Sequence, residues 1–281
     1  MNFINYNGDI LPANQAVLTV GNRSFKYGDG LFESMRLKDG NLMFADLHAD
    51  RLKRGMQALK MEGAAAINEN FLRTKAAELL YRNQYRDNAR LRLTVFRDAE
   101  GLYSPSGNRS GYAFEMSELQ ESQYLSNAKG LIVDVFDELT KPVNYLSNLK
   151  TCNSLLFVMA GIYRKQNNLD EVFLLNQHGF LCESMSSNVF VLYNNTLYTP
   201  ALSEGCIEGV MRTVVMNLAE ENGLPVVEAQ INPEILNIAE EVFLTNTSRG
   251  IQWVMGFNNK RYFNETSKML LDKLNSVSSS S

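Results

Sequence analysis

Four polar segments of the 281-residue chain contain side chains that could bind a charged cofactor or do chemistry on it. The first segment is centred on Lys150, which precedes an apolar helical pattern expected from about Thr151 to Lys165. Partial desolvation at such a place lowers the pKa of a lysine, whose neutral amine can form a Schiff base with a carbonyl. A single lysine is more often a solvated surface residue, so Lys150 needs support from the other segments.

The second and third segments carry groups suited to a phosphate. The loop Gly205–Gly209 leads directly into a helix expected from about Val210 to Asn222. A helix start offers unpaired N–H groups and the positive end of the helix dipole, although an ordinary loop-to-helix junction is the alternative. Thr245-Asn246-Thr247-Ser248 ends an apolar strand, where its hydroxyls and amides could complete a phosphate site or form only a turn.

The fourth segment, Glu183-Ser184-Met185-Ser186-Ser187-Asn188, also follows an apolar strand. A carboxylate at the end of a buried strand needs a partner. The protonated ring nitrogen of a cofactor is one candidate, and an Arg or Lys of the protein is the other. The order of Lys150, Glu183, Val210 and Thr247 along the chain makes the four segments more informative together than each is alone.

The elements that must position these segments fall into two halves. A change of composition between Met116 and Asn127 predicts two domains, 1–119 and 120–281. Strands and helices do not alternate regularly, and no Gly-x-Gly-x-x-Gly motif follows a strand, so the fold class is α+β rather than a dinucleotide-binding fold. In the first half we expect strands at 16–20, 31–37 and 91–96, helices at 46–59 and 68–83, and a long loop from Asp98 to Gly111. In the second half we expect strands at 131–135, 172–175, 180–183, 189–193, 196–199, 226–230 and 241–245, and a disordered tail at Ser278–Ser281.

The composition argues against several classes of protein. The formal net charge is −4 and basic residues are mixed with acidic ones, which does not favour a nucleic-acid-binding surface. No apolar run approaches the roughly 18 residues needed to cross a bilayer, and residues 1–6 do not resemble a secretory signal, so we expect a cytoplasmic protein without a membrane partner. With only His48 and His178 present, no metal site is expected.

The chain resembles the fold-type-IV pyridoxal-phosphate enzymes, the class IV aminotransferase superfamily. This superfamily includes branched-chain aminotransferases, D-amino-acid aminotransferases and 4-amino-4-deoxychorismate lyases. The resemblance implies a D-amino-acid-aminotransferase-like fold with a small N-terminal α+β domain and a larger pseudo-barrel C-terminal domain, assembled as a homodimer. It rests on five motifs in the order of the family: Tyr27-Gly28-Asp29-Gly30-Leu31-Phe32-Glu33, His48-Ala49-Asp50-Arg51-Leu52, Lys150-Thr151-Cys152-Asn153, Glu183-Ser184-Met185-Ser186-Ser187-Asn188-Val189-Phe190 and Gly209-Val210-Met211-Arg212.

The resemblance implies a role for each matching residue. Lys150 is the catalytic residue, which binds pyridoxal 5′-phosphate as a Schiff base and then moves a proton between the substrate and the cofactor. Glu183 pairs with the pyridine nitrogen and keeps it protonated, so that the ring acts as an electron sink. The cofactor phosphate contacts the Arg51 guanidinium, the backbone N–H groups of Val210 and Met211, and the Thr247 hydroxyl, while Ser187 and Asn188 line the ring or order the Glu183 loop.

Departures from the family pattern leave the substrate open. Lys150 is followed by Thr151-Cys152-Asn153, without the Gly-Gly-Asn-Tyr of branched-chain aminotransferases and closer to the D-amino-acid and lyase branches. The arginine that precedes Gly-Tyr in the lyases is missing, and Gly101 or Leu102 takes its place. The candidates for substrate binding are therefore Arg92, Arg97 and Arg109, each of which is alternatively a solvated charge, together with Tyr27 and Tyr103.

Three functions follow from the resemblance. The first is transfer of an amino group between an amino acid and a 2-oxo acid. The second is the lyase reaction, in which aminodeoxychorismate releases pyruvate and gives p-aminobenzoate. The third is a non-enzymatic cofactor-binding protein that retains the fold, against which the joint presence of Lys150, Glu183 and Arg51 counts.

Overall fold

A computed structural model describes residues 2–277 and divides the chain into two compact units. The first unit contains Met1–Gln123 and Leu149–Ser154, and the second contains Tyr124–Asn148 and Leu155–Ser281. The division after Gln123 lies close to the boundary expected at residues 119 and 120. It differs for the segment around Lys150, which belongs to the first unit rather than to a domain spanning 120–281. The serine tail expected to be disordered lies outside the described residues.

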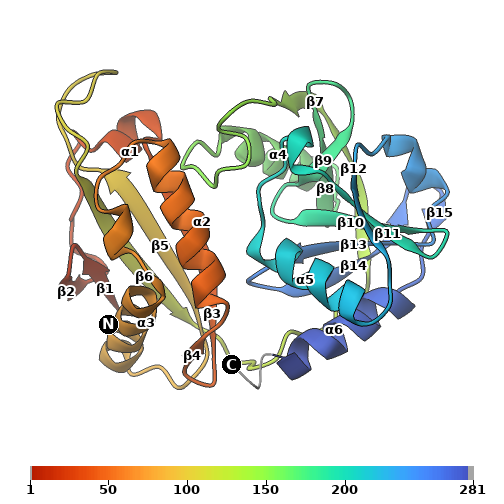
Figure 1. Ribbon diagram of the computed structural model, residues 1–281, viewed down its shortest axis with the longest axis horizontal. Helices are drawn as coiled ribbons and strands as arrows, with labels where there is room; N and C mark the ends of the chain where they lie inside the picture. Colours follow the sequence, from red (N-terminus) through yellow and green to blue (C-terminus); the bar gives the residue numbers. More distant parts are fainter. Residues whose placement is uncertain (1, 278–281) are drawn as a thin grey trace. The chain divides into compact units, whose positions relative to one another are not determined.

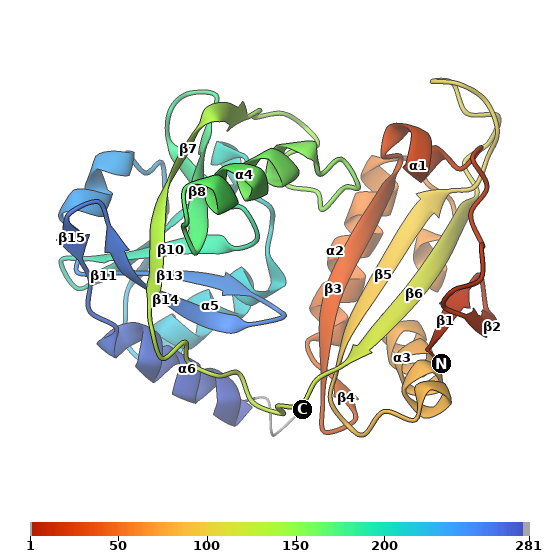
Figure 2. The ribbon, with the colours of Figure 1, turned by 180° about the vertical axis from the view of Figure 1, so that it is seen from behind.

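The first unit is built on a sheet whose strands follow the order β2-β1-β6-β5-β3-β4. Helix α2 lies against one face of this sheet, and the view from behind shows β3, β5 and β6 in front of it (Figures 1 and 2). The elements are β1 (Phe3–Tyr6), β2 (Asp9–Pro12), α1 (Arg23–Tyr27), β3 (Gly30–Lys38), β4 (Asn41–Leu42), α2 (Ala45–Ala58), the 3-10 helix η1 (Ala64–Ala66), α3 (Glu69–Asn83), β5 (Ala89–Arg97) and β6 (Ser110–Glu118).

Alternating side chains explain how the two central strands of this unit pack. Strand β3 pairs antiparallel with β5, so that Met35 lies opposite Leu91 and Leu31 opposite Val95. These side chains are buried in one core with apolar residues of α2 and α3, as the period of two in 91–96 predicts. Helix α3 starts after Asn68, whose side chain accepts the N–H of Phe71 in a standard N-cap.

Residues 16–20 and the loop at 98–109 differ in how well they match their expected conformations. The predicted strand at 16–20 is wrong, because those residues have no strand partner and the chain continues into α1. An apolar run alone does not make a strand when no neighbouring edge is available to pair with it. The expected long loop is confirmed over residues 98–109, and strand β6 begins at Ser110.

The second unit contains a larger sheet, in the order β12-β11-β10-β13-β14-β7-β8-β9, with β15 paired to β14. This sheet curls, with α5 and α6 against β13 and β14 and α4 against β7 and β8 (Figure 1). Its elements are β7 (Leu131–Lys141), α4 (Leu155–Gln166), β8 (Glu171–Asn176), β9 (Leu181–Ser184), β10 (Asn188–Tyr193), β11 (Thr196–Pro200), η2 (Leu202–Glu204), α5 (Val210–Glu221), β12 (Val226–Ala229), η3 (Pro233–Asn237), β13 (Glu241–Asn246), β14 (Gly250–Phe257), β15 (Lys260–Arg261) and α6 (Glu265–Val277).

The sequence patterns predict neither β14 nor α6 in the second unit. Strand β14 completes the middle of the sheet by pairing with β13 on one side and β7 on the other. Helix α6 is fixed at its first turn by Glu241, whose carboxylate accepts the N–H groups of Thr266 at 2.7 Å and Ser267 at 3.0 Å. A carboxylate from another element thus satisfies N–H groups that a cap within the helix would otherwise have to satisfy.

Helix α4 differs from its expectation in its start and its surroundings. It begins at Leu155 rather than near Thr151, because Thr151 is paired with Leu31 in an isolated bridge. The apolar stripe predicted on this helix is largely exposed, with Leu155 73 %, Val158 53 % and Ile162 46 % accessible. Met159, the fourth residue of the predicted stripe, packs together with Ala160 against the sheet. None of the helices within residues 2–277 is both long enough and apolar enough to cross a membrane.

Candidate active site

Lys150 lies at the edge of the sheet of the first unit. The N–H of Phe32 donates to the carbonyl of Lys150 at 2.9 Å, and the N–H of Cys152 donates to the carbonyl of Gly30 at 2.9 Å. Two main-chain hydrogen bonds therefore fix the backbone on both sides of Thr151. The Lys150 ammonium lies over the Phe32 ring, 4.4 Å from its centroid. The lysine is thus placed by a strand-like segment, and not by the helix start that its sequence context predicts.

The three arginines predicted as substrate ligands have different surroundings. Arg92 lies over the Phe32 ring, with 3.9 Å between its guanidinium carbon and the ring centroid, so it shares this aromatic neighbour with Lys150. Arg97 is buried and donates to Asp29, Asn108 and the main-chain carbonyls of residues 59 and 60. Arg109 is exposed and pairs with Asp98 at 3.2 Å. Arg92 is therefore the arginine that the fold brings near Lys150.

Arg51, predicted to bind the cofactor phosphate, is part of a buried cluster with Glu33 and His48. The Arg51 Nε donates to Glu33 Oε1 at 2.8 Å, and its terminal nitrogen donates to the other carboxylate oxygen. The His48 Nδ1 lies 2.7 Å from Glu33 Oε2. Burial alone would raise the pKa of Glu33, but the charges and hydrogen bonds of Arg51 and His48 outweigh it and bring the pKa to about 2.

His48 is completely buried and takes part in this cluster through its ring. Burial lowers its pKa against the opposing effect of the Glu33 charge, while Arg51 and Lys150 lower it further. A neutral ring with Nδ1–H directed at Glu33 leaves Nε2 as an acceptor, and Nε2 has no partner among the residues that the structure describes.

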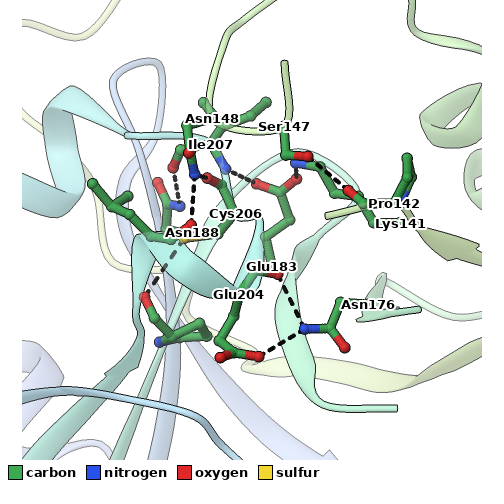
Figure 3. Close-up of polar contacts among 12 residues, drawn as sticks. Lys141, Pro142, Ser147, Asn148, Asn176, Glu183, Asn188, Glu204, Cys206 and Ile207 are labelled. Atoms are coloured by element: carbon green, nitrogen blue, oxygen red, sulfur yellow. Dashed lines mark hydrogen bonds and ion pairs between the residues drawn. The ribbon is translucent and has the colours of Figure 1, made fainter. Parts of the chain in front are cut away.

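Glu183, predicted to face the pyridine nitrogen, is buried in the second unit and pairs with Lys141 (Figure 3). Its other carboxylate oxygen accepts the N–H of Ile207 at 2.9 Å. The sequence leaves two possible partners for Glu183, a cofactor ring nitrogen and a basic side chain. In the structure, Glu183 pairs with a basic side chain. Lys141 is itself buried at the end of β7 and was not singled out in the sequence. No local pattern identifies it, because its role depends on the neighbouring strands β8 and β9.

The start of α5 is suited to an anion. Its N-cap, Gly209, contributes no side-chain hydrogen bond, so the first N–H groups, at Val210 and Met211, depend on another acceptor. A Cβ at Gly209 would lie 1.9 Å from the Asn188 Oδ1, which explains why glycine occupies this position. Asn188 also donates to the carbonyl of Ile207 at 2.8 Å and so orders the loop before the helix.

The remaining predicted residues of the second unit lie along the same sheet edge. Asn188 starts β10 and is paired with Thr245 of β13, so Thr247, two residues further on, lies near the same end of the sheet. Ser187 accepts a hydrogen bond from Asn246 at 2.9 Å. The main-chain carbonyl of Thr247 accepts the Tyr124 hydroxyl at 3.1 Å. The structure therefore brings Glu183, Ser187, Asn188, Thr247 and the start of α5 to one region of this unit.

Tyr27 and Tyr103 contact each other, with their ring centroids 5.4 Å apart. Tyr103 is 88 % exposed on the loop of residues 98–109. Arg23 anchors this loop, because its guanidinium donates to the carbonyls of Gly101 and Leu102 and pairs with Asp29 at 2.7 Å. Within residues 2–277, no group of three or more His, Cys, Asp or Glu side chains is arranged to bind a metal ion.

Comparison with known proteins identifies the family. A D-alanine aminotransferase of Bacillus licheniformis is 27 % identical over 86 % of this chain and 84 % of its own length. An aminodeoxychorismate lyase of Bacillus subtilis is 25 % identical over 86 % of this chain and 82 % of its own. The crystal structure of a branched-chain aminotransferase from Thermobaculum terrenum in its PLP form has the same fold, with a TM-score of 0.86 at 20 % identity over 98 % of this chain and 93 % of that one. This likeness confirms the predicted fold.

The decisive match is that of the sequence profile described as amino-transferase class IV, which covers residues 30–255. This range includes the Lys150 segment, the Glu33 cluster and the residues around Glu183 and the start of α5. The matched region accounts for most of the chain, and pyridoxal phosphate is the cofactor of this family. The chain belongs to the class IV aminotransferases.

Proposed function

We propose that the chain transfers an amino group between an amino acid and a 2-oxo acid, with Lys150 as the residue that binds pyridoxal 5′-phosphate covalently. The observation that carries this proposal is the placement of Lys150 by two main-chain hydrogen bonds at the edge of β3. The same short region contains Arg92, a cation available beside the shared ring of Phe32. A lysine and a carboxylate-binding arginine in one place are what an amino-acid substrate requires.

The residues of the chain fit the cofactor. The α5 start, with Gly209 lacking a side-chain cap, offers N–H groups to a phosphate, and the close approach of Asn188 excludes any larger residue there. Glu183 is a buried carboxylate suited to a ring nitrogen, and Lys141 and the Ile207 N–H orient it. When bound, pyridoxal phosphate supplies an electron sink that stabilises negative charge at the substrate α-carbon.

Each residue then has a defined task. The Lys150 amine attaches the cofactor and moves a proton to and from the substrate α-carbon. Arg51 binds the phosphate through its guanidinium while Glu33 fixes its orientation. The N–H groups of Val210 and Met211 and the hydroxyl of Thr247 complete the phosphate site. Ser187 and Asn188 order the loop next to Glu183.

Arg92 is the residue that we propose for the substrate carboxylate. Arg97 uses its guanidinium in at least four hydrogen bonds within the first unit, and Arg109 is a solvated charge 77 % exposed at its side chain. All three guanidinium nitrogens of Arg97 donate within the protein, so Arg97 cannot also bind a substrate without losing its own contacts. Tyr27 and Tyr103, which contact each other at the loop of residues 98–109, remain candidates for contact with the substrate side chain.

The test of the covalent lysine uses a matched pair of variants. The purified protein loaded with pyridoxal phosphate and reduced with borohydride should retain the cofactor on a single peptide containing Lys150. Lys150→Ala should abolish this labelling, and Lys165→Ala, at an exposed lysine of α4, should leave it unchanged. Full labelling of Lys150→Ala would refute the assignment.

The lyase reaction is the second candidate because an aminodeoxychorismate lyase is among the relatives and because the Gly-Gly-Asn-Tyr motif is absent after Lys150. Incubation with one amino acid and no acceptor separates the two reactions. Conversion of the cofactor to pyridoxamine phosphate supports amino transfer, which is the expected result. Release of pyruvate from aminodeoxychorismate without an acceptor supports the lyase. A protein that remains colourless with added pyridoxal phosphate would favour the third, non-enzymatic function.

We also propose that the protein is a homodimer in which α4 contacts a second copy. Leu155, Val158 and Ile162 occupy one face of α4 and are all exposed in the single chain. Light scattering should give the mass of a dimer, and Val158→Lys should shift it to the mass of a monomer. Lys165→Ala on the same helix is the control and should stay dimeric. A wild-type protein with a monomer mass contradicts the proposal.

A cytoplasmic location is the last part of the proposed function. Cys152, Cys182 and Cys206 are free, and burial raises the pKa of Cys206 to about 12, so this thiol is unreactive. Unpaired cysteines are typical of a reducing compartment. Recovery of a tagged chain in the membrane or secreted fraction would contradict this part.

A further inference from the structure

We propose that Tyr124 is a positioning residue for the phosphate site, on which it acts through Thr247. This inference rests on the proposed function, because Thr247 is one of the residues assigned there to the cofactor phosphate. Tyr124 and Thr247 both belong to the second unit, so their contact does not depend on the first unit. Tyr124 belongs to none of the motifs on which the family resemblance rests.

The Tyr124 hydroxyl binds the turn that carries Thr247. It donates to the main-chain carbonyl of Thr247 at 3.1 Å in a buried hydrogen bond. Tyr124 is 3 % exposed, so water does not compete freely for this contact, and the low local dielectric strengthens it. A buried tyrosine hydroxyl usually finds a hydrogen-bond partner, and here that partner is the backbone of a residue proposed to bind the phosphate.

The backbone of Tyr124 is fixed by Asn275 of α6. The Asn275 Oδ1 accepts the N–H of Tyr124 at 2.9 Å, and its Nδ2 donates to the carbonyl of Tyr124 at 2.9 Å. One side-chain amide thus binds both main-chain polar groups of a single residue. The chain runs beside α6 as it leads into β7 (Figure 2), and this helix supports the residue that carries the ring.

Gly250 leaves the space that the Tyr124 ring occupies. It is the first residue of β14, is paired with Asn246 of β13, and has a φ of +71°. A Cβ at this position would lie 2.7 Å from the Cγ of the Tyr124 ring. Both the positive φ and the close ring therefore favour glycine here. The ring is thus packed against the base of the β13–β14 hairpin, whose turn contains Thr247.

Asn246 binds the same turn at different residues. Its Oδ1 accepts the N–H of Ser248 at 3.0 Å and the N–H of Arg249 at 2.8 Å. Such bonds from an Asn side chain to the backbone that follows it are typical of turns. They restrain the residues after Thr247, whereas Tyr124 binds the Thr247 carbonyl itself. Tyr124 therefore supplies a restraint on Thr247 that the Asn246 side chain does not.

Restraint of the Thr247 backbone restricts where its hydroxyl can lie. Threonine is branched at Cβ, so a fixed backbone leaves its Oγ1 few side-chain rotamers. A group that binds a ligand should be held within about 0.5 Å of its bonding position, because free energy is otherwise lost in ordering it. Without the Tyr124 hydroxyl, the turn should sample more positions and bind phosphate less tightly. The effect of Tyr124 therefore depends on the presence of the Thr247 hydroxyl.

A double-mutant cycle with pyridoxamine phosphate tests this dependence. This molecule carries the phosphate but has no aldehyde to bond to Lys150, and its dissociation constant is measured on the cofactor-free full chain by equilibrium dialysis. Tyr124→Phe, which deletes only the hydroxyl, should raise the constant about fivefold. Thr247→Val, which keeps the shape of the side chain, should raise it about tenfold. The double variant should stay within about twofold of Thr247→Val, because no hydroxyl remains to be positioned.

Tyr262→Phe is the matched control. Tyr262 is a second buried tyrosine of this unit, and its hydroxyl also donates to a main-chain carbonyl, that of Leu236. This variant should leave the dissociation constant unchanged. An equal rise in Tyr262→Phe and Tyr124→Phe would show a general loss of stability and overturn the positioning role. No rise in Tyr124→Phe, or a further rise of the same size on top of Thr247→Val, would also overturn it.

Failure of the proposed function has a different signature. A wild-type chain that does not bind pyridoxamine phosphate would refute the proposed function as a whole. A Thr247→Val variant that binds as tightly as the wild type would remove Thr247 from the phosphate site, and the role of Tyr124 with it. A rise in Thr247→Val without one in Tyr124→Phe would keep the phosphate site and refute only the role of Tyr124.

Discussion

Two of the buried carboxylates, Glu33 in the first unit and Glu183 in the second, are stabilised in different ways. Glu33 in the first unit is bound by His48 and Arg51, which lie three residues apart on one turn of α2. Glu183 in the second unit is bound by the ammonium of Lys141 and by one main-chain N–H. Both partners of Glu33 thus come from a single helix, whereas the partners of Glu183 come from the end of β7 and from the loop before α5.

This difference determines how each carboxylate responds to the loss of a partner. Glu33 retains a two-pronged bond from Arg51 if His48 is removed. Within residues 2–277, removal of Lys141 leaves Glu183 with the neutral Ile207 N–H and without a cation. A buried charge that loses its counter-ion is far more costly than one that loses a neutral donor. The two sites should therefore differ most clearly in variants that delete one partner.

Lys141→Met should have the largest effect on stability. The side chain keeps a similar length but leaves Glu183 buried beside a thioether, which should cost about 3–5 kcal/mol of unfolding free energy. The quantity is measured by urea denaturation of the cofactor-free protein. Adding Glu183→Gln in the same chain should recover most of the loss, because no unpaired charge remains. An unchanged denaturation midpoint in Lys141→Met would show that Glu183 does not depend on this cation.

Acid should weaken the Glu33 cluster by a somewhat smaller amount. Its carboxylate has a pKa of about 2 in the folded protein against an ordinary value of 4.5, so it favours the folded state above pH 4.5. This stabilisation is lost as the pH falls toward 2, and the difference corresponds to about 3 kcal/mol. Unfolding free energies between pH 5 and pH 2 measure the slope, which Glu33→Gln should flatten. Glu69→Gln, in an exposed pair with Arg73, should leave the slope as it is.

His48→Leu should have the smallest effect, about 1 kcal/mol. Burial lowers the pKa of His48, so near neutral pH the ring acts as a neutral donor to Glu33, and Arg51 continues to bind that carboxylate. His48→Asn, which can place an amide near the position of Nδ1, should cost less than His48→Leu. The measurement is again the urea midpoint at pH 7. A loss of unfolding free energy as large as that of Lys141→Met would mean that Glu33 depends on His48 as strongly as Glu183 depends on Lys141.

The same contrast explains which parts of the site could be predicted. Arg51 belongs to a short motif on a regular helix, and its identification needed only the His48-Ala49-Asp50-Arg51-Leu52 pattern. Lys141 belongs to no local pattern, because it reaches Glu183 through the pairing of β7 with β8 and of β8 with β9. Long-range pairing is not encoded in the spacing of neighbouring residues. The sequence therefore predicts that the partner of Glu183 is a lysine or an arginine, but it does not predict which one.

The fold could be predicted to a similar extent. Periodic segments such as α2, α3, α5 and β5 lie within a few residues of their expected positions, because each buries one face. The apolar run at 16–20 failed as a strand, and the expected start of α4 was wrong by four residues. Both errors occur where the backbone pairing of another segment, or its absence, decides the conformation.

The strand-like segment Leu149–Ser154 has a consequence for any attempt to divide the protein. It closes the edge of β3 in the first unit, although it lies between two stretches of the second unit along the chain. A fragment ending at Gln123 would therefore lack a piece of its own sheet and present an open strand edge, which favours aggregation. The first unit is topologically incomplete until the ribosome has added the lysine segment, so its native sheet can close only during or after synthesis of the second.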